Sequence, residues 1–424
     1  MNTEIRTIAI SINKVALVSF WGTILFFFPD STYGMPGAIW QVGRFVDYLT
    51  ILFSFYIITE YYILTRRGKR QQGLLWGFVA LAVVFVLSGV VNWKIVETFR
   101  YILGKTIPMI GMVCMVECGI IRDPKALIDG IYTNLYILCI FNFVLTFIYP
   151  DGLYRNMNYT WSAFSESVYF LGTKNTMTGY YYTAIVLIGV KAIIFNKRLG
   201  IMEYLFIILF WFEMLHVRCT LGIACCVMMT TLVALLLTGR KLTSRKNAYV
   251  NSGNKRMLMK MAYVVIMLFQ LLLLFSEAII SKFSDVVQKY FKKAHSVNVR
   301  QVIWNGAIRQ IVESPILGKS VSSVASTYLN VPWYAHNGYL DVALKAGIIG
   351  IIVMMIIHIL SMDSLSYCTD ERLTLWCFGA FATLMIMSSI EGPFLSYKYI
   401  IILPLMYHAN TLVDYSKKTL IGVC

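Results

Sequence analysis

The chain has 424 residues and a formal net charge of +16, with 58% apolar and only 14% charged residues. Its mean hydropathy is +0.69. Soluble domains carry about 25% charged residues, so these values exclude an ordinary soluble protein and predict an integral membrane protein.

Long apolar runs follow one another along the chain. A membrane-spanning helix needs about 20 mostly apolar residues, and by this criterion we predict an all-α polytopic membrane protein with about 12 transmembrane helices. The predicted spans are residues 15–28, 45–64, 73–92, 101–121, 128–149, 176–196, 200–216, 219–238, 258–280, 338–361, 374–390 and 396–413. No small-residue cleavage site follows the first run, so we expect it to be kept as a membrane anchor.

Basic residues concentrate in two connections between the predicted spans. Thr65–Arg70 and Arg240–Lys260 contain several lysines and arginines and no acidic residue. Basic short loops stay in the cytoplasm. We therefore predict that both termini are cytoplasmic and that three connections face outside: Pro150–Asn175, His216–Arg218 and a long polar insert.

The long insert divides the chain into three parts. We predict a transmembrane bundle of about nine spans over residues 1–280, an extracytoplasmic loop with the catalytic residues over 281–337, and C-terminal transmembrane helices over 338–424. From Ser281 to His336 the insert carries seven basic and two acidic residues. These cations either bind an anionic ligand, or the long loop crosses the membrane despite its charge.

Within the insert, apolar residues recur at the spacing of an amphipathic helix. The pattern includes Val302, Ile303, Ala307 and Ile311, and Ser314-Pro315 ends it. It predicts a helix of about four turns on the outer membrane surface. Arg300 and Arg309 lie off the apolar stripe, where they would bind either a substrate or lipid head groups.

One arginine lies between two predicted spans. In MLHVRCTLG only two or three residues turn the chain, which places Arg218 at the outer mouth of the bundle. Charged residues at membrane depth are costly and usually mark a function, although an arginine can also extend its charge to the membrane surface. Its guanidinium offers a planar set of donors that binds phosphate in a bidentate manner.

Histidine is the residue type best suited to proton transfer near neutral pH. His336 ends the long insert, and Asn337 after it is a favourable N-cap for the following helix. We predict that His336 is a general base, with His216 as the competing candidate. We expect His295 to be less important, and His358 and His408, inside apolar runs, to be structural.

No motif indicates nucleotide or metal chemistry. The sequence contains neither GxxxxGK[ST] nor a GxGxxG that opens a helix, and it has no cluster of aspartates. Most of the nine cysteines fall in apolar runs, where cysteine acts as a small hydrophobic residue. We expect no cofactor, no metal and no nucleic-acid partner.

Several motifs resemble those of the O-antigen polymerase/ligase superfamily, the Wzy-type polymerases and WaaL-type ligases. They are VRQVIW (Arg300, Trp304), ESPILGKS, YAHNGYL, MLHVRCTLGIACCVM and LGTKNTMTGYY, within about Leu171–Gly350. The family's outer-edge segment is usually TxSRxxL, whereas here Val217 and Cys219 flank Arg218. The order of these motifs is more specific than any one of them.

The resemblance implies a metal-independent, inverting glycosyltransferase of the GT-C type whose donor is a glycan on undecaprenyl pyrophosphate. Arg218 and Arg300 would then bind the pyrophosphate, and His336 would deprotonate the acceptor hydroxyl. Further substrate contacts are expected from Arg309, Lys174, Asn175 and Lys319. The site would face outward from the bacterial cytoplasmic membrane.

Three functions remain open at this point. We prefer a polymerase of lipid-linked repeat units for capsule, exopolysaccharide or O-antigen, because such proteins diverge while keeping these few motifs. A ligase that transfers glycan to lipid A core is the alternative, and a flippase or other transporter is a third. A chain-length regulator and a flippase are possible partners. Because no internal repeat typical of transporters is visible, we favour an enzyme.

Overall fold

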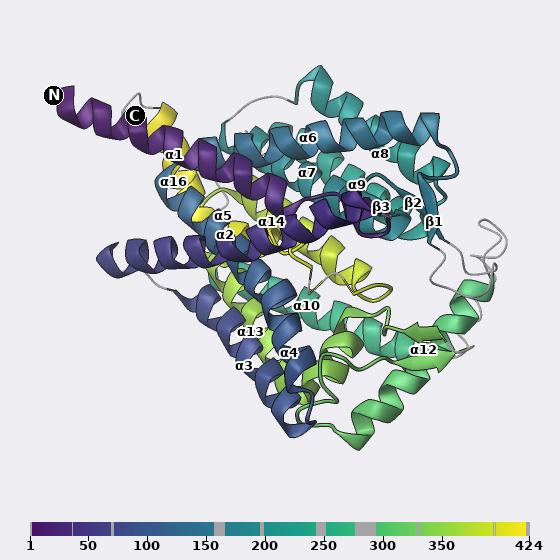
Figure 1. Cartoon of the computed structure of the whole chain (residues 1–424). Coiled ribbons are helices and arrows are strands. Elements are labelled where there is room, and N and C mark those ends of the chain that lie inside the picture. The colour runs from purple at the N-terminus through teal and green to yellow at the C-terminus, as the bar shows by residue number, and fades with distance from the viewer. Residues whose placement is uncertain are drawn as a thin grey trace.

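The computed structural model describes residues 2–35, 37–68, 72–156, 166–195, 199–242, 252–275, 294–328, 331–392, 394 and 396–420. It is an all-α helical bundle, as predicted (Figure 1). The first half contains α1 (Asn2–Phe26), α2 (Ala38–Gly68), α3 (Gly73–Val91), α4 (Ile95–Tyr101), α5 (Ile107–Arg122) and α6 (Pro124–Ile148). The second half contains α7 (Lys174–Ile194), α8 (Ile201–His216), α9 (Thr220–Leu242), α10 (Ser252–Phe275), α12 (Ala294–Glu313), α13 (Gly338–Ser366), α14 (Glu371–Met387), α15 (Ile402–Tyr407) and α16 (Ala409–Leu420).

Eight helices among the described residues are long and apolar enough to cross a membrane. The count of about 12 spans stays a prediction. Helices α8 and α14 are apolar but have only 16 and 17 residues, and within α1 the described residues Lys14–Phe26 form a shorter apolar helix.

The last predicted span, residues 396–413, is wrong as a single helix. Turns occupy residues 397–401, and α15 and α16 meet at His408. A continuous helix would have carried Lys398 into an apolar environment. Instead, the segment turns so that Lys398 pairs with Asp30, in the short helix η1 (Asp30–Tyr33). Neutralising a buried cation in this way outweighs the regular backbone bonds of a longer helix.

Helix α7 is the centre of the bundle. It packs on α6, α9 and α14. Of its most apolar 18 consecutive residues, 94% are buried inside the protein. Tyr180, Tyr181 and Tyr182 are fully buried, and each hydroxyl donates to a backbone carbonyl. Because hydroxyls without partners would be costly in an apolar interior, these bonds fix the rotation of α7. They thereby set the direction of the residues at its N-terminus.

Short strands and α12 lie on one side of the bundle, and both chain ends lie on the other side (Figure 1). One antiparallel sheet contains β1 (Tyr154–Asn156), β2 (Glu166–Tyr169) and β3 (Gly172–Thr173). The other contains β4 (Ser326–Tyr328) and β5 (Val331–Trp333). The sequence had indicated only loops here, because strands of two to four residues leave no periodic signal.

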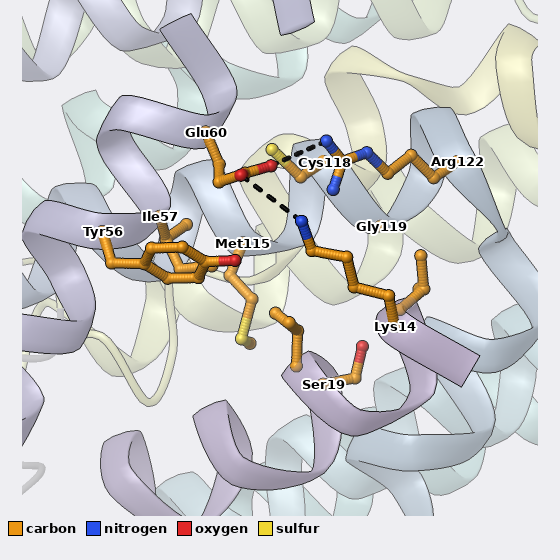
Figure 2. Close-up of a pocket in the computed structure, with 11 residues that line it drawn as sticks. Lys14, Ser19, Tyr56, Ile57, Glu60, Met115, Cys118, Gly119 and Arg122 are labelled. Atoms are coloured by element: carbon orange, nitrogen blue, oxygen red, sulfur yellow. Dashed lines mark hydrogen bonds and ion pairs between the residues drawn. The ribbon is translucent and has the colours of Figure 1, made fainter. Parts of the chain in front are cut away.

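The end with the chain termini is held by an ion-pair cluster. Figure 2 shows Lys14 of α1 and Arg122 of α5 pointing at Glu60 of α2. The N–O distances to the carboxylate are 3.4 Å and 2.8 Å. The adjoining cavity has a volume of about 20 Å³, room for about one water molecule. The ion pairs join three helices. The cavity beside them is too small to hold a lipid-linked glycan.

Helix α13 contains a break that a neighbouring loop fills. Gly347 has φ 63° and ψ −160°, a non-helical conformation. Two backbone groups near the break are paired with the loop instead of with their own helix. The Lys319 N–H donates to the Leu344 carbonyl at 2.7 Å, and the Ile348 N–H donates to the Pro315 carbonyl at 2.8 Å. The ESPILGKS segment is therefore built into α13, and the exchange satisfies the polar groups of a broken membrane helix.

We predict that Gly347→Ala strongly destabilises the protein. A Cβ at this position would lie 2.2 Å from the Ile316 carbonyl oxygen, in a conformation essentially restricted to glycine. The expected loss is about 3 kcal/mol or more, read as a lower unfolding temperature in detergent. Gly37→Ala is the matched control, because Gly37 has φ +72° and no atom of the described part of the chain lies within 4 Å of a Cβ there. Equal losses in both variants would contradict the loop-docking explanation.

Candidate active site

The His336 segment is fixed by the residue that follows it. Asn337 is the N-cap of α13, and its side chain accepts from the Tyr339 and Leu340 N–H groups. Its amide also donates to the Ser389 carbonyl at 3.1 Å, and the Gly338 N–H donates to the Ser388 carbonyl at 2.7 Å. One buried side chain thus caps α13 and joins it to the turn that follows α14.

Two of the predicted catalytic residues have a backbone conformation that is rare for residues other than glycine. Among the described non-glycine residues, four have positive φ, and these include Arg218 at 50° and His336 at 46°. Such conformations cost free energy and cluster at functional sites. Arg218 lies in the short turn between α8 and α9, as the sequence predicted.

The predicted amphipathic helix is α12, and it ends at Glu313 as expected. Its apolar face packs against the protein rather than lying free for lipid. Ile303, Trp304 and Ala307 are buried against a cluster that includes Leu340 and Leu344 of α13. Val302 was expected on this face but is 44% exposed. Helix α12 is therefore held by α13. This contact fixes the position of Arg300, which lies in the N-terminal half of α12.

Glu391, in the turn after α14, connects the site. Its Oε1 accepts from Asn175 Nδ2 at 2.7 Å and from Arg300 Nη2 at 3.1 Å. Its Oε2 lies 3.1 Å from His336 Nδ1. The Glu391 side chain is only 16% exposed. One carboxylate therefore gathers residues from α7, from α12 and from the segment before α13.

The surrounding charges keep Glu391 ionised. Burial alone would raise the pKa of its carboxyl group, but His336, Arg300 and Lys174 outweigh burial and lower the pKa below the ordinary value of 4.5. Because an ionised carboxylate can only accept hydrogen bonds, the proton between the two side chains belongs to His336 Nδ1. In the neutral ring, Nε2 then carries the lone pair and is the basic atom.

The N-terminus of α7 connects this cluster to the Arg218 turn. Cys219 Sγ lies 3.3 Å from the Lys174 carbonyl and 3.5 Å from Asn175 Oδ1. The same amide donates to Glu391 through Nδ2. Arg218 is exposed beside this link. The structure thus brings Lys174, Asn175, Arg300 and His336 to one cluster and places the Arg218 backbone next to it.

The structure does not bring the other predicted binding residues to this cluster. Arg309 is exposed, and it lies nine residues, or about two and a half helical turns, from Arg300, on the opposite face of α12. Lys319 pairs with Glu313 at 3.0 Å beside the break in α13. His216 stacks on Phe212 and Phe147, with ring centroids 6.0 Å and 6.3 Å apart.

Two other histidines have structural contacts, as predicted. His358 is buried and lies 3.1 Å from the Tyr263 hydroxyl. His408 Nε2 lies 3.1 Å from the buried Glu117 carboxylate, at the join of α15 and α16. The side chain of His295 is outside the described residues. Among the described residues there is no group of three or more His, Cys, Asp or Glu that could hold a metal ion, and metal independence stays a prediction.

Sequence reasoning missed Glu391, although a signal was present. The residue stands in SSIEGP, between the apolar runs predicted as spans 374–390 and 396–413. An acidic residue in an outer turn, next to Gly392, is more often simply solvated. Nothing in the sequence indicates that this turn packs against the start of α13.

The comparisons with known proteins can be set against this geometry. Residues 168–355 match the family model described as O-antigen ligase. No curated protein matches the chain. The matched region includes Asn175, Arg218, Arg300 and His336, whereas Glu391 lies beyond it. The resemblance indicated by the sequence motifs is thereby confirmed, and the match supports assigning this chain to the O-antigen polymerase/ligase superfamily.

Proposed function

We propose that the protein is a polysaccharide polymerase that joins oligosaccharide repeat units carried on undecaprenyl pyrophosphate. The observation that carries the proposal is the cluster in which Glu391 contacts Arg300, His336 and Asn175. It combines an oriented base with a cation suited to a diphosphate. The superfamily match supports a reaction on lipid-linked glycans in a bilayer.

His336 is the base in this proposal. With Nδ1 held by Glu391, Nε2 accepts the proton of the acceptor hydroxyl. A carboxylate that orients an imidazole and stabilises its protonated form is a recurring arrangement in acid–base catalysis. Glu391 does not itself take up the proton, since its pKa is lowered. It is a positioning residue for His336 and Arg300.

Arg300 and Arg218 bind the leaving diphosphate. A guanidinium has five N–H donors and remains charged at every physiological pH. The Arg300 side chain is only 24% exposed, and charge stabilisation is stronger in such a partly dehydrated place than in water. Lys174, at the N-terminus of α7, adds positive charge, and the helix dipole there also favours an anion.

The proposed reaction is a single displacement at the anomeric carbon of the donor sugar. The acceptor oxygen forms a bond to this carbon as the bond between the carbon and the diphosphate oxygen breaks. The hydroxyl proton goes to His336 Nε2, and the bonding electron pair leaves on the diphosphate. The configuration inverts, and undecaprenyl pyrophosphate is released.

We further propose that the site faces outward from the bacterial cytoplasmic membrane. The site lies at the end of the bundle with α12 and the strands, away from both chain termini (Figure 1). The basic connections Thr65–Arg70 and Arg240–Lys260 support cytoplasmic termini. Lipid-linked repeats, a flippase and a chain-length regulator are then the expected partners.

A ligase is the second candidate, because the matching family model is described as O-antigen ligase. The donor chemistry and the roles of Arg300 and His336 would be unchanged. Only the acceptor would differ, being lipid A core instead of a second lipid-linked repeat. The products of one purified reaction therefore separate the two functions.

The central prediction concerns His336 and Arg300. Purified protein in lipid nanodiscs should convert a synthetic polyprenyl-pyrophosphate repeat into a ladder of products on a gel. His336→Asn and Arg300→Ala should remain folded and lower the rate by about 10²-fold or more. Asparagine is chosen because it tolerates positive φ. Transfer only to lipid A core would identify a ligase, and full-length polymer from either variant would refute the assigned roles.

A second prediction uses the lowered pKa of Glu391. Glu391→Gln should lose about 1–3 kcal/mol of stability at neutral pH, since Arg300 and His336 lose their counter-charge. A carboxyl group whose pKa is lowered in the folded state stabilises that state at pH values above its ordinary pKa of 4.5. This stabilisation is lost as the pH falls through the pKa of the folded state. The difference in unfolding temperature from wild type should therefore shrink as the pH falls below about 4.5.

The control for this titration is Glu313→Gln, because Glu313 is 54% exposed and pairs with Lys319. It should change the unfolding temperature little at any pH. A wild-type minus Glu391→Gln difference that does not shrink below about pH 4.5 would contradict the role given to this carboxylate.

A third prediction tests the binding mode of Arg218. Arg218→Lys keeps the charge but loses the planar donor set, so kcat/KM for the lipid-linked donor should fall by about tenfold or more. Arg155→Lys is the control, because Arg155 of β1 is exposed at the same end of the bundle. Normal donor kinetics in Arg218→Lys would show that Arg218 contributes only its positive charge and not bidentate binding.

A further inference from the structure

A buried ion pair lies in α13 immediately after the His336 segment. Lys345 Nζ lies 2.6 Å from Asp341 Oδ2, and the two side chains are only 8% and 12% exposed. Asp341 Oδ1 is buried and has no hydrogen-bond partner among the described residues. Charged groups inside a membrane helix are costly and indicate a function. The roles proposed for Glu391, His336 and Arg300 do not require this pair.

Two tyrosines from other segments face the same lysine. Lys345 Nζ lies 5.4 Å from the ring centroid of Tyr101, at the end of α4, and 6.0 Å from that of Tyr334. Tyr334 precedes His336 by two residues and is 62% exposed. An aromatic ring with one open face next to a hydrogen-bonding charged pair is suited to a ligand that has both apolar and hydroxyl surfaces.

A second lysine lies one turn along the chain from Tyr101. Lys105 lies in the π-helix η2 (Ile102–Thr106), a conformation often found at functional sites. Its spacing from Tyr101 places the two residues on about the same face. Lys105 is exposed, yet it is close enough to the buried Lys398 for their charges to interact.

The turn after α14 leaves room beside these groups. Gly392 follows Glu391 and is exposed, and among the described residues the only atom within 4 Å of a Cβ built there is Asp341 Oδ2, at 4.0 Å. Any larger residue would extend into the space between the turn and α13. The absence of a side chain leaves space beside the Asp341 carboxylate, next to the carboxylate that orients the base.

We propose that Tyr101, Lys105, Tyr334, Asp341 and Lys345 form a subsite for the sugar that carries the accepting hydroxyl. We call this set the acceptor wall, and the inference rests on the proposed polymerase function. Sugars present hydroxyls that pair with carboxylates and ammonium groups, and faces of C–H groups that pack on aromatic rings. An Asp–Lys pair has no net charge, so it suits a sugar better than a second diphosphate.

The position of the wall assigns it to the acceptor rather than to the donor. The cations that suit the donor diphosphate, Arg300 and Arg218, come from α12 and the turn before α9. The wall instead follows His336 along α13 and includes Tyr334 just before it. A base must lie within hydrogen-bond reach of the hydroxyl it deprotonates, so the accepting sugar has to lie on this side.

The test separates the two substrates. A fluorescent lipid-linked repeat with a methylated accepting hydroxyl can only donate, and an unlabelled repeat at varied concentration then accepts. Tyr334→Ala should raise KM for the acceptor about tenfold, or about 1.4 kcal/mol, and leave KM for the donor unchanged. Tyr334→Phe keeps the ring and should behave like wild type. Gly392→Leu fills the space and should act like Tyr334→Ala.

Further variants exclude a general effect of charge. Lys105→Met should also raise KM for the acceptor, whereas Lys125→Met, an exposed lysine at the opposite end of the bundle, should not. An unchanged acceptor KM in Tyr334→Ala, or an equal rise in donor KM, would overturn the acceptor wall. If wild-type protein couples no repeats at all, the proposed function fails instead, and the two failures are distinguishable.

Discussion

The arrangement of the site depends on one buried carboxylate with three partners. Without Glu391, the imidazole of His336, the guanidinium of Arg300 and the amide of Asn175 would have no common contact, because they come from separate segments of the chain. Two of these partners are positively charged or can become so, and a third cation, Lys174, adds to the attraction. The carboxylate therefore stays ionised where burial alone would protonate it.

The surrounding fold explains why these segments meet. The three tyrosine hydroxyls of α7 fix its rotation, and Asn337 joins the start of α13 to the turn after α14. The ESPILGKS loop is inserted at the break in α13, and its covalent connection to α12 limits where that helix can lie. Each support is a hydrogen bond to a backbone group, the kind of interaction that stays strong when water is excluded.

The sequence allowed the membrane class, the helical fold, the C-terminal end of α12 and the candidates Arg218, Arg300 and His336 to be predicted, because these depend on local pattern. Partners brought together from distant segments could not be predicted. Glu391 is an example, since its turn meets the start of α13 through Asn337 and Gly338, which are distant from it in the sequence. The broken span around Lys398 is another, because its partner Asp30 is more than 300 residues away in sequence. The sequence also grouped Arg309 with Arg300, although helical geometry places them on opposite faces of α12.

In the proposed reaction, the contact between Arg300 and Glu391 determines how the donor diphosphate binds. The guanidinium is already engaged with an acidic side chain, so a diphosphate enters by exchanging partners and gains only the difference between two interactions. The same exchange in reverse returns the internal carboxylate when the lipid carrier departs. Product release is thereby favoured, because Glu391 competes with the diphosphate for Arg300. For the same reason an empty site has little tendency to retain inorganic phosphate.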